Sequence, residues 1–237
     1  MRTYAYGGKA PTLNAALVQQ ELARAHRYKN TLAEIGRTYY LAREAIWAPY
    51  EKVRQAECDR LKAVGSSERP GKTVLTPEDE VKLQAVKEVY SAAVRVERAR
   101  CGICWGTYQL VEEAAQKALA SGEAPQFHRW DGSGTVAVHI QGAALTVADL
   151  LKGEDTRVRL VGAGKHRRLC LRVGSGMPGR TPIWANFPVV YHRELPLDAA
   201  IKWVRVVVRR VATKFDYSAQ FVLDGEGLGV LPAATKG

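Results

Sequence analysis

The chain has 237 residues, 46% of them hydrophobic and 25% charged, which is enough to bury a core in one large domain or two modest ones. Its formal net charge of +11 favours polyanionic partners, because basic side chains neutralise phosphates and release counterions. No apolar run approaches the ~20 residues of a membrane helix, and the first residues lack the apolar segment of a signal peptide. We therefore expect a cytoplasmic protein without a membrane partner.

The first part of the chain predicts a short strand and then a long helix. Arg2–Tyr6 alternates aromatic and other residues, and Gly7-Gly8 ends the strand. Over Leu13–Trp47, apolar residues recur at steps of three and four, which indicates a helix of ~50 Å. Pro49 is expected to kink or end this helix, and residues 50–64 can resume it.

A second helix is predicted after a loop rich in glycine and serine. Thr76 can cap this helix, Pro77 suits its first position, and the acidic residues that follow complement the helix dipole. The helix is expected to run to about Ala120 and to pack antiparallel on the first. Gly102 and Gly106 interrupt it, and either close helix approach or a break would explain them. A helical hairpin of this length suits a spacer or clamp better than a pocket.

The rest of the chain predicts short strands separated by turns. Asp131-Gly132-Ser133-Gly134 indicates a tight turn in which the glycines can take positive φ. A short helix is expected at Val147–Lys152. The predicted strands are Thr135–Ile140, Arg157–Val161, Leu169–Val173, Ile183–Tyr191, Ile201–Val211 and Tyr217–Leu223. Strands of this length and spacing favour a small barrel or sandwich, so the predicted fold class is α+β.

Common catalytic and metal-binding motifs are missing from the sequence. Cys101 and Cys104 have C-x-x-C spacing, but without a second close pair or a nearby histidine they favour a packed pair over zinc or redox chemistry. The glycine-rich residues 174–180 lack the spacing of a phosphate-binding loop, and dinucleotide, nucleophile-elbow and zinc-protease motifs are also missing. We expect no catalytic residue, no metal and no cofactor in this chain.

Two segments of the predicted β region resemble a known family. FHRWDGSGTVAVHIQ, over Phe127–Gln141, resembles the opening of the second wedge segment in miniature type V CRISPR effectors. The resemblance is greatest to the type V-M (formerly V-U) branch, relatives of the transposon-encoded TnpB proteins. Phe187–Pro196 (FPVVYHRELP) and Ile201–Ala212 (IKWVRVVVRRVA) are similar to the continuation of the same wedge. The helices match only in character, and an ordinary first hairpin of a β domain is the alternative for the first segment.

The resemblance implies a helical recognition lobe inserted into an oligonucleotide-binding-like β-barrel, the wedge domain. On this interpretation residues 1–12 form the first wedge strand, 13–122 the helical lobe, 123–224 the wedge barrel and 225–237 a tail or linker stub. The first strand would pair with the later strands. In the family a RuvC nuclease-like domain with a zinc-binding insert follows the wedge, and this chain is expected to stop before it.

The resemblance also implies contacts to the guide scaffold or to the DNA motif beside the target. The residues expected to make them are His128, Arg129, Trp130, His192 and Arg193. In the same context, basic residues of the helices become candidates for contacting a guide–target duplex, although such charges are usually the solvated face of an amphipathic helix. These residues are Arg24, Arg27, Lys29, Arg37, Arg43, Arg95 and Arg98.

Physical arguments add two further groups of candidate RNA-binding residues. On Ile201–Val211, one face is expected to carry Trp203, Arg205 and Arg209, which could stack on an unpaired base and bind phosphates. An edge strand kept soluble by its arginines is the alternative. A dense basic cluster follows a glycine turn, and solvated loop charge is its alternative. Its members are Lys165, Arg167, Arg168 and Arg172.

The function implied by the resemblance is a guide-RNA-binding component that supports RNA-guided binding of double-stranded DNA without cleavage by this chain. The expected partners are guide RNA and target double-stranded DNA, with a separate RuvC-like subunit or a second copy as further candidates. Three alternatives stay open: half of a split effector whose RuvC nuclease is on another chain, a general RNA-binding regulatory protein outside CRISPR, and a structural or inhibitory protein. Processing of precursor guide RNA also stays open.

Overall fold

The computed structural model describes residues 1–122, 124–141, 145–173 and 183–224. These residues fall into two compact units, each described by itself. The sheet unit contains residues 1–27, 101–111 and 129–237, and the helical unit contains residues 28–100 and 112–128. The glycine-rich segment 174–180 and the expected tail 225–237 lie outside the described residues.

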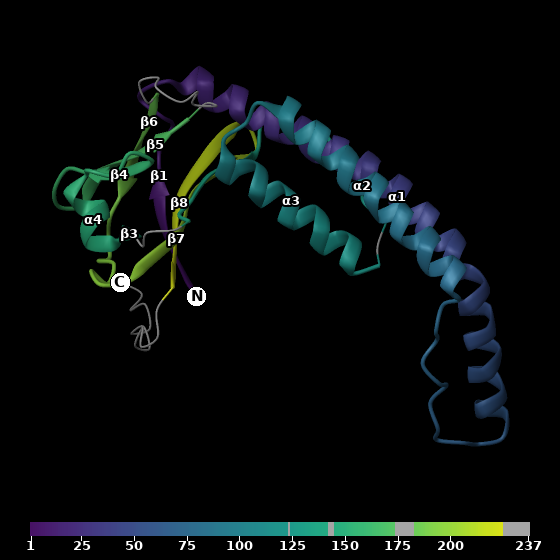
Figure 1. Cartoon of the computed structure of the whole chain (residues 1–237). Coiled ribbons are helices and arrows are strands. Elements are labelled where there is room, and N and C mark those ends of the chain that lie inside the picture. The colour runs from purple at the N-terminus through teal and green to yellow at the C-terminus, as the bar shows by residue number, and fades with distance from the viewer. Residues whose placement is uncertain (123, 142–144, 174–182, 225–237) are drawn as a thin grey trace. The chain divides into compact units, whose positions relative to one another are not determined.

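Three long helices account for the chain between the first strand and the strand-rich part (Figure 1). They are α1 (Ala15–Ala63), α2 (Pro77–Cys101) and α3 (Trp105–Ala120). Helix α1 passes Pro49 without ending, so two expected helical segments form one helix. Proline removes only one backbone donor from the helix. The next residue, Tyr50, is held in place because its hydroxyl donates to Asp79 Oδ2 at 2.6 Å.

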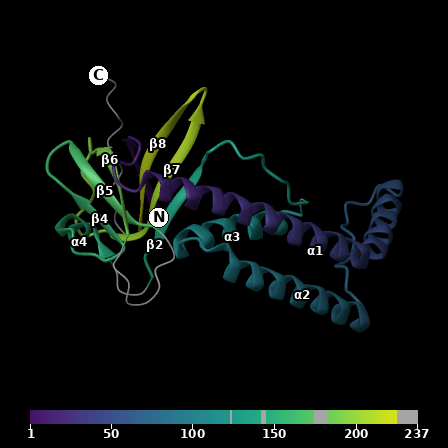
Figure 2. The same ribbon diagram turned by 90° about the horizontal axis from the view of Figure 1, so that it is seen from above.

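In the helical unit, α1 and α2 form the antiparallel pair that the sequence predicts. Tyr39 meets Tyr90 with ring centroids 5.0 Å apart, while Tyr50 meets the start of α2 at Asp79. The two helices run along each other in Figure 1, and Figure 2 shows them from a second direction. Of the two options for Gly102, the structure shows a break: its φ of 59° is left-handed, which glycine adopts without strain, and α2 ends one residue earlier.

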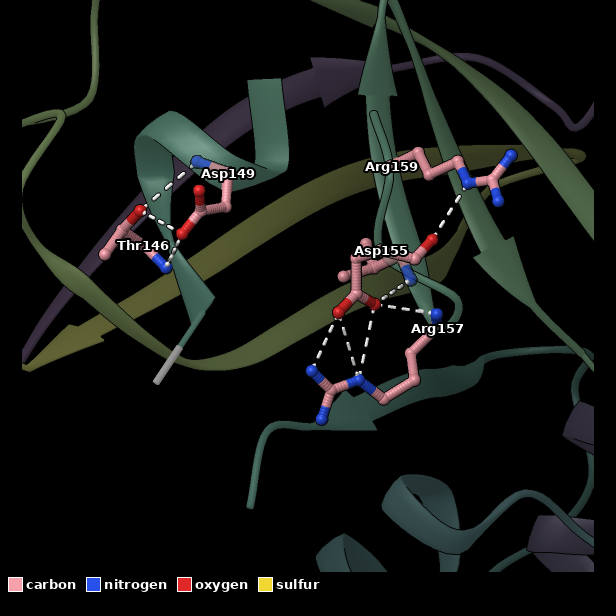
Figure 3. Close-up of polar contacts among 6 residues, drawn as sticks. Thr146, Asp149, Asp155, Arg157 and Arg159 are labelled. Carbon is pink, nitrogen blue, oxygen red and sulfur yellow. Dashed lines mark hydrogen bonds and ion pairs between the residues drawn. The ribbon is translucent and has the colours of Figure 1, made fainter. Parts of the chain in front are cut away.

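Among the described residues, the sheet unit contains eight strands, one short helix, and the first parts of α1 and α3. The strands are β1 (Arg2–Gly8), β2 (Gly134–His139), β3 (Leu145–Thr146), β4 (Val158–Val161), β5 (His166–Arg172), β6 (Trp184–Val190), β7 (Ala200–Val211) and β8 (Lys214–Asp224). Helix α4 spans Val147–Lys152, as predicted. Thr146 and Asp149 cap it reciprocally: the Thr146 hydroxyl accepts from the Asp149 amide at 3.2 Å (Figure 3).

The strands form one antiparallel sheet in the order β2-β7-β8-β1-β6-β5-β4, with β3 also paired to β7. Strand β1 pairs with β8 from Arg2↔Leu223 to Gly8↔Tyr217, so the expected pairing with later strands is observed. The expected closed barrel is not found, because β2 and β4 are the two ends of the described sheet and do not pair. Strands β1 and β6 meet only at Gly8↔Val189. The fold is therefore α+β with an open sheet.

A large apolar core lies in the sheet unit. Its largest fully buried side chains include Tyr4, Tyr6, Phe187 and Phe221. The start of α1 adds Val18 and Leu22 to the same core. Burial of this many large side chains is the main source of stability that the sheet unit has available.

Candidate nucleic-acid interface

Three tyrosines from two strand regions form a compact cluster, called the tyrosine cluster below: Tyr4, Tyr6 and Tyr191. The Tyr6 and Tyr191 rings stack with centroids 5.1 Å apart and an interplanar angle of 13°. The Tyr6 hydroxyl donates to the Arg193 carbonyl oxygen at 2.8 Å, and the Tyr191 hydroxyl accepts from the Leu195 amide at 2.9 Å. Burial raises the pKa of Tyr6, so the phenol stays neutral.

Two arginines lie on these rings. The Arg193 guanidinium carbon is 4.8 Å from the Tyr4 ring centroid, and that of Arg167 is 4.7 Å from the Tyr191 ring centroid. The Tyr191 amide donates to the Lys165 carbonyl oxygen at 2.7 Å, and the His192 ring lies 5.2 Å from Tyr6. The structure thus brings together four predicted RNA-binding residues, Lys165, Arg167, His192 and Arg193, from two separate segments.

The geometry at Arg167 leaves one donor unused. Its Nε atom is buried and has no hydrogen-bond partner within the described residues. A guanidinium that stacks on an aromatic ring keeps both its orientation and its charge. The tyrosine cluster therefore orients positive charge without neutralising it.

A second basic group lies on the opposite face of β4–β6 from the core. In-register pairing places Arg159 beside Cys170, and Arg172 beside Trp184. The Arg159 guanidinium carbon is 4.4 Å from the Trp184 ring centroid. Arg168 is exposed one pleat along β5 from Cys170. Arg168 and Arg172 were predicted, whereas Arg159 was missed, although the alternation of Val158 to Val161 places it on the outer face.

Asp155 fixes this second group at its edge (Figure 3). Its carboxylate accepts from Arg157 Nη2 at 2.7 Å and from the Val158 amide at 3.0 Å, and its carbonyl oxygen accepts from Arg159 Nε at 2.8 Å. Burial acts to raise the pKa of Asp155, but the hydrogen bonds from Arg157 and the backbone outweigh burial and lower it. Asp155 therefore neutralises Arg157, while Arg159 contacts only its backbone oxygen.

Trp203 does not offer the free ring that the sequence analysis expected. It is 6% exposed, packs with Ala137, Val222 and Leu110, and stacks on His139 at 4.1 Å between centroids. The Arg205 guanidinium carbon covers the ring at 4.9 Å. A base would have to displace these groups before it could stack, so the ring is structural in this conformation.

Strand β7 is also not an edge strand, because β2 and β8 pair with its two sides. A register shift between Ile201 and Trp203 moves Ile201 to the core side, where Val204 also lies. Strict alternation had placed these two residues on opposite faces. Arg209, farther along the strand, is exposed.

The predicted residues around 128–130 are exposed and belong to different units. In the helical unit, the His128 amide donates to Asn30 Oδ1 at 3.0 Å. In the sheet unit, Trp130 lies 5.1 Å from the His26 ring, and the turn after it has Gly132 at φ 87°. The predicted turn is confirmed at Gly132, where a Cβ would come within 2.6 Å of Phe215.

Among the helical candidates, Arg98 is engaged inside the helical unit. Its guanidinium makes two hydrogen bonds to Glu112, one of them from Nε to Oε1 at 2.7 Å, and the Tyr28 hydroxyl donates to the same carboxylate. These bonds raise the pKa of Arg98. Arg24 donates to the Gly102 carbonyl oxygen at 3.3 Å. Arg27, Lys29, Arg37 and Arg95 are exposed and Arg43 is half-buried.

The first turn of α3 covers the free edge of β2. Thr107 Oγ1 accepts from the Ala137 amide at 3.2 Å, and a Cβ at Gly106 would lie 2.4 Å from the Ala137 carbonyl oxygen. Glu21 accepts from the Cys104 amide at 2.6 Å, and burial raises its pKa despite this bond. The glycine at 106 is thus required by close approach, an option that the sequence analysis had left open.

The described residues contain neither a candidate metal site nor a candidate membrane-spanning helix. No group of three His, Cys, Asp or Glu side chains there is placed to hold a metal ion. No helix in the described part of the chain combines the length and hydropathy needed to cross a membrane.

Comparison with known proteins gives a consistent result, although no protein-family model matches the sequence. A Pelobacter propionicus protein named CRISPR-associated DNA-binding protein Cas12m is 27% identical over 212 residues, covering 75% of this chain and 30% of the relative. The protein of the same name from Allomeiothermus silvanus is 26% identical over 266 aligned positions, covering 100% of this chain and 48% of the relative. The chain is a homologue of Cas12m proteins.

A third relative with this name, from Thermanaerosceptrum fracticalcis, is 30% identical over 134 residues, covering 50% of this chain and 22% of the relative. The chain thus spans from 22% to 48% of the length of the three relatives described. Their shared name describes CRISPR-associated DNA binding.

Proposed function

We propose that the chain is a guide-RNA-binding component of a type V CRISPR effector, and that it supports RNA-guided binding of double-stranded DNA without cutting it. In this proposal the sheet unit takes the part of the wedge domain and the helical unit that of the recognition lobe. The relatives named Cas12m support a CRISPR role, and the wedge-like segments Phe127–Gln141 and Phe187–Pro196 support this division of tasks.

The observation that carries the proposal is the tyrosine cluster with its two stacked arginines. RNA presents a dense row of phosphates, and arginine forks bind phosphate oxygens through paired N–H donors. Arg167 and Arg193 are held on rings at 4.7 and 4.8 Å, which lowers the entropy lost when a phosphate binds. Lys165 and His192 add donors beside them. We assign the guide RNA to this surface first.

The outer face of β4–β6 is the second RNA contact that we propose. Arg159, Arg168 and Arg172 lie there without an ion pair among the described residues. Arg129, Trp130 and the exposed Arg209 are further candidates in the sheet unit, as is His128 in the helical unit. Arg205 and Trp203 contribute by holding β7 against α3 rather than by stacking on a base.

Contacts to the guide–target duplex are assigned to exposed basic residues of the helices. In the helical unit these are Lys29, Arg37 and Arg95, with Arg43 half-buried, and in the sheet unit they are Arg24 and Arg27. Arg98 is a weaker candidate, because its bidentate pair with Glu112 already uses its charge. Base pairing by the guide would select the target, and these residues would hold its backbone.

A competition experiment tests the proposal. The purified chain is bound to a labelled repeat-derived guide RNA, and a shuffled RNA of equal length competes. We expect the guide to outcompete the shuffled RNA and the complex to bind matching duplex DNA without cleaving it in Mg²⁺. Equal competition would support a general RNA-binding protein instead, and metal-dependent cutting by this chain would contradict binding without cleavage.

Two alternatives predict different results in the same preparation. A split effector predicts that a second polypeptide with nuclease activity co-purifies with the chain. If the chain is a structural or inhibitory protein, it should carry no bound nucleic acid, and its elution from a polyanionic column should not depend on salt concentration.

A further inference from the structure

Helix α2 carries two apolar faces. One face packs inside the helical unit, where Val94 is buried and the Tyr90 ring lies 5.0 Å from that of Tyr39. The other face, called the α2 seam below, is exposed, with Val89 at 71% and Val96 at 49%. The members of the α2 seam are Ala85, Val89, Ala92, Val96 and Ala99. Because α2 uses only one apolar face inside its own unit, its exposed apolar face is available to contact another molecule.

The spacing of the α2 seam is that of a coiled coil. From Ala85 to Ala99 the steps are four, three, four and three residues, which is a heptad repeat. Val89 and Val96 take one core position, and Ala85, Ala92 and Ala99 take the other. Branched valines facing small alanines allow two helix backbones to approach closely.

The charges beside the α2 seam select an antiparallel partner with the same sequence. If Val89 of one copy faces Ala92 of a second copy, heptad geometry places Glu88 opposite Arg95 of the second copy. Two-fold symmetry makes the same contact again in the reverse direction. Near the helix ends, the same register places Asp79 opposite Arg100 of the second copy. All these pairs join opposite charges.

The parallel arrangement lacks this complementarity. It would place Arg95 beside Arg100 of the second copy and bring the two Lys82 residues together. Like charges at these positions oppose association. The members of the α2 seam themselves offer no donors to nucleic-acid phosphates, whereas Lys82, Arg95 and Arg100 lie beside it.

We propose that two copies of the chain associate through the α2 seam as an antiparallel, two-fold pair. This association needs neither RNA nor DNA, because the paired surfaces supply both the apolar contact and the opposite charges. It is therefore separable from RNA binding by the sheet unit.

Sedimentation equilibrium of the full chain, treated with nuclease, tests the pair. The wild type should approach twice its 26.1 kDa mass as concentration rises. Val89→Glu should weaken association by about 100-fold, because it buries a charge in the apolar contact. The matched control Val53→Glu changes an α1 valine that is 72% exposed and lies off the α2 seam, so it should associate like the wild type. A wild type that stays at 26.1 kDa, or equal effects of both substitutions, would overturn the proposal.

A charge swap tests the antiparallel register. Glu88→Arg or Arg95→Glu alone should each weaken association by about tenfold, since each creates like-charge contacts twice. The double variant should restore association to near the wild-type level. Failure of the double variant to recover would overturn the antiparallel register, and loss of association after nuclease treatment would overturn a protein-only contact.

Discussion

The two units hold arginine side chains against different kinds of group. In the sheet unit, Arg159, Arg167 and Arg193 lie on aromatic rings, which fix their orientation but leave their charge in place. In the helical unit, Arg98 is held by the carboxylate of Glu112, which cancels its charge. The comparison teaches that an aromatic ring orients an arginine without cancelling its charge, whereas a carboxylate such as Glu112 holds an arginine and cancels its charge.

The largest expected effect comes from breaking the helical arrangement with Glu112→Ala. Glu112 is 8% exposed and joins α1, α2 and α3 through Tyr28 and Arg98. Its removal leaves a phenol and a guanidinium without their acceptor, which should cost the helical unit about 3 kcal/mol. Denaturant unfolding followed by helix circular dichroism measures the loss. The exposed neighbour gives a control, since Glu113→Ala should change stability by less than about 0.5 kcal/mol.

In the sheet unit, Gly106→Ala tests the seat of α3 on β2. The added methyl would lie 2.4 Å from the Ala137 carbonyl oxygen, so a backbone must shift, at a cost of about 2 kcal/mol. Gly7→Ala is the control, because no atom lies within 4 Å of its new Cβ. Equal midpoints for both variants in urea would show that α3 does not require this close approach.

A smaller effect, of opposite sign, is expected at the turn between β7 and β8. Ala212 has φ 54°, a left-handed conformation that costs an L-residue about 1 kcal/mol. Ala212→Gly should therefore raise the free energy of unfolding by up to about 1 kcal/mol. Ala5→Gly, on the exposed side of β1, should lower it instead, and destabilisation by both substitutions would contradict the strained turn.

The smallest effect is a pH dependence at Glu21, whose pKa burial raises from its ordinary 4.5. A raised pKa in the folded state means that the contribution of Glu21 to stability is present below about pH 4.5 and is lost as the pH rises through the folded-state pKa. The free energy of unfolding of Glu21→Gln should therefore rise relative to that of the wild type as the pH increases from about 4 to about 8. Urea titrations at several pH values measure this difference, and Glu44→Gln, on the exposed side of α1, should not reproduce it.

Much of the fold follows from local patterns in the sequence. Alternation located six of the later strands, and Thr76-Pro77 located the start of α2, because periodicity and capping act over a few residues. The open sheet could not be predicted, since closure depends on whether the end strands β2 and β4 pair with each other, which no local pattern decides. The register shift in β7 also escaped the pattern, because one extra residue in a strand leaves no clear mark in sequence.

The basic residues of the candidate site could be predicted from the sequence, but the aromatic rings on which they lie could not. The basic residues near 165 were predicted from their density in the sequence and those near 192 from the family resemblance, and pairing of β5 with β6 brings them together. Arg193 lies on Tyr4 of β1, which is far away in sequence, so no local pattern could join the two. Trp203 shows the converse: strand alternation placed it on the outer face, but α3 covers that face through Leu110.

The salt dependence of RNA affinity tests the central claim most directly. Arg167→Ala combined with Arg193→Ala should lower affinity for guide RNA and reduce the slope of log K against log salt by about 2, one for each lost phosphate contact. The control pair Arg54→Ala and Arg60→Ala removes equal charge from arginines already paired with Glu51 and Glu57, so its slope should stay near that of the wild type. Equal slopes for all three proteins, or an equal loss in the control, would contradict an RNA contact at the tyrosine cluster.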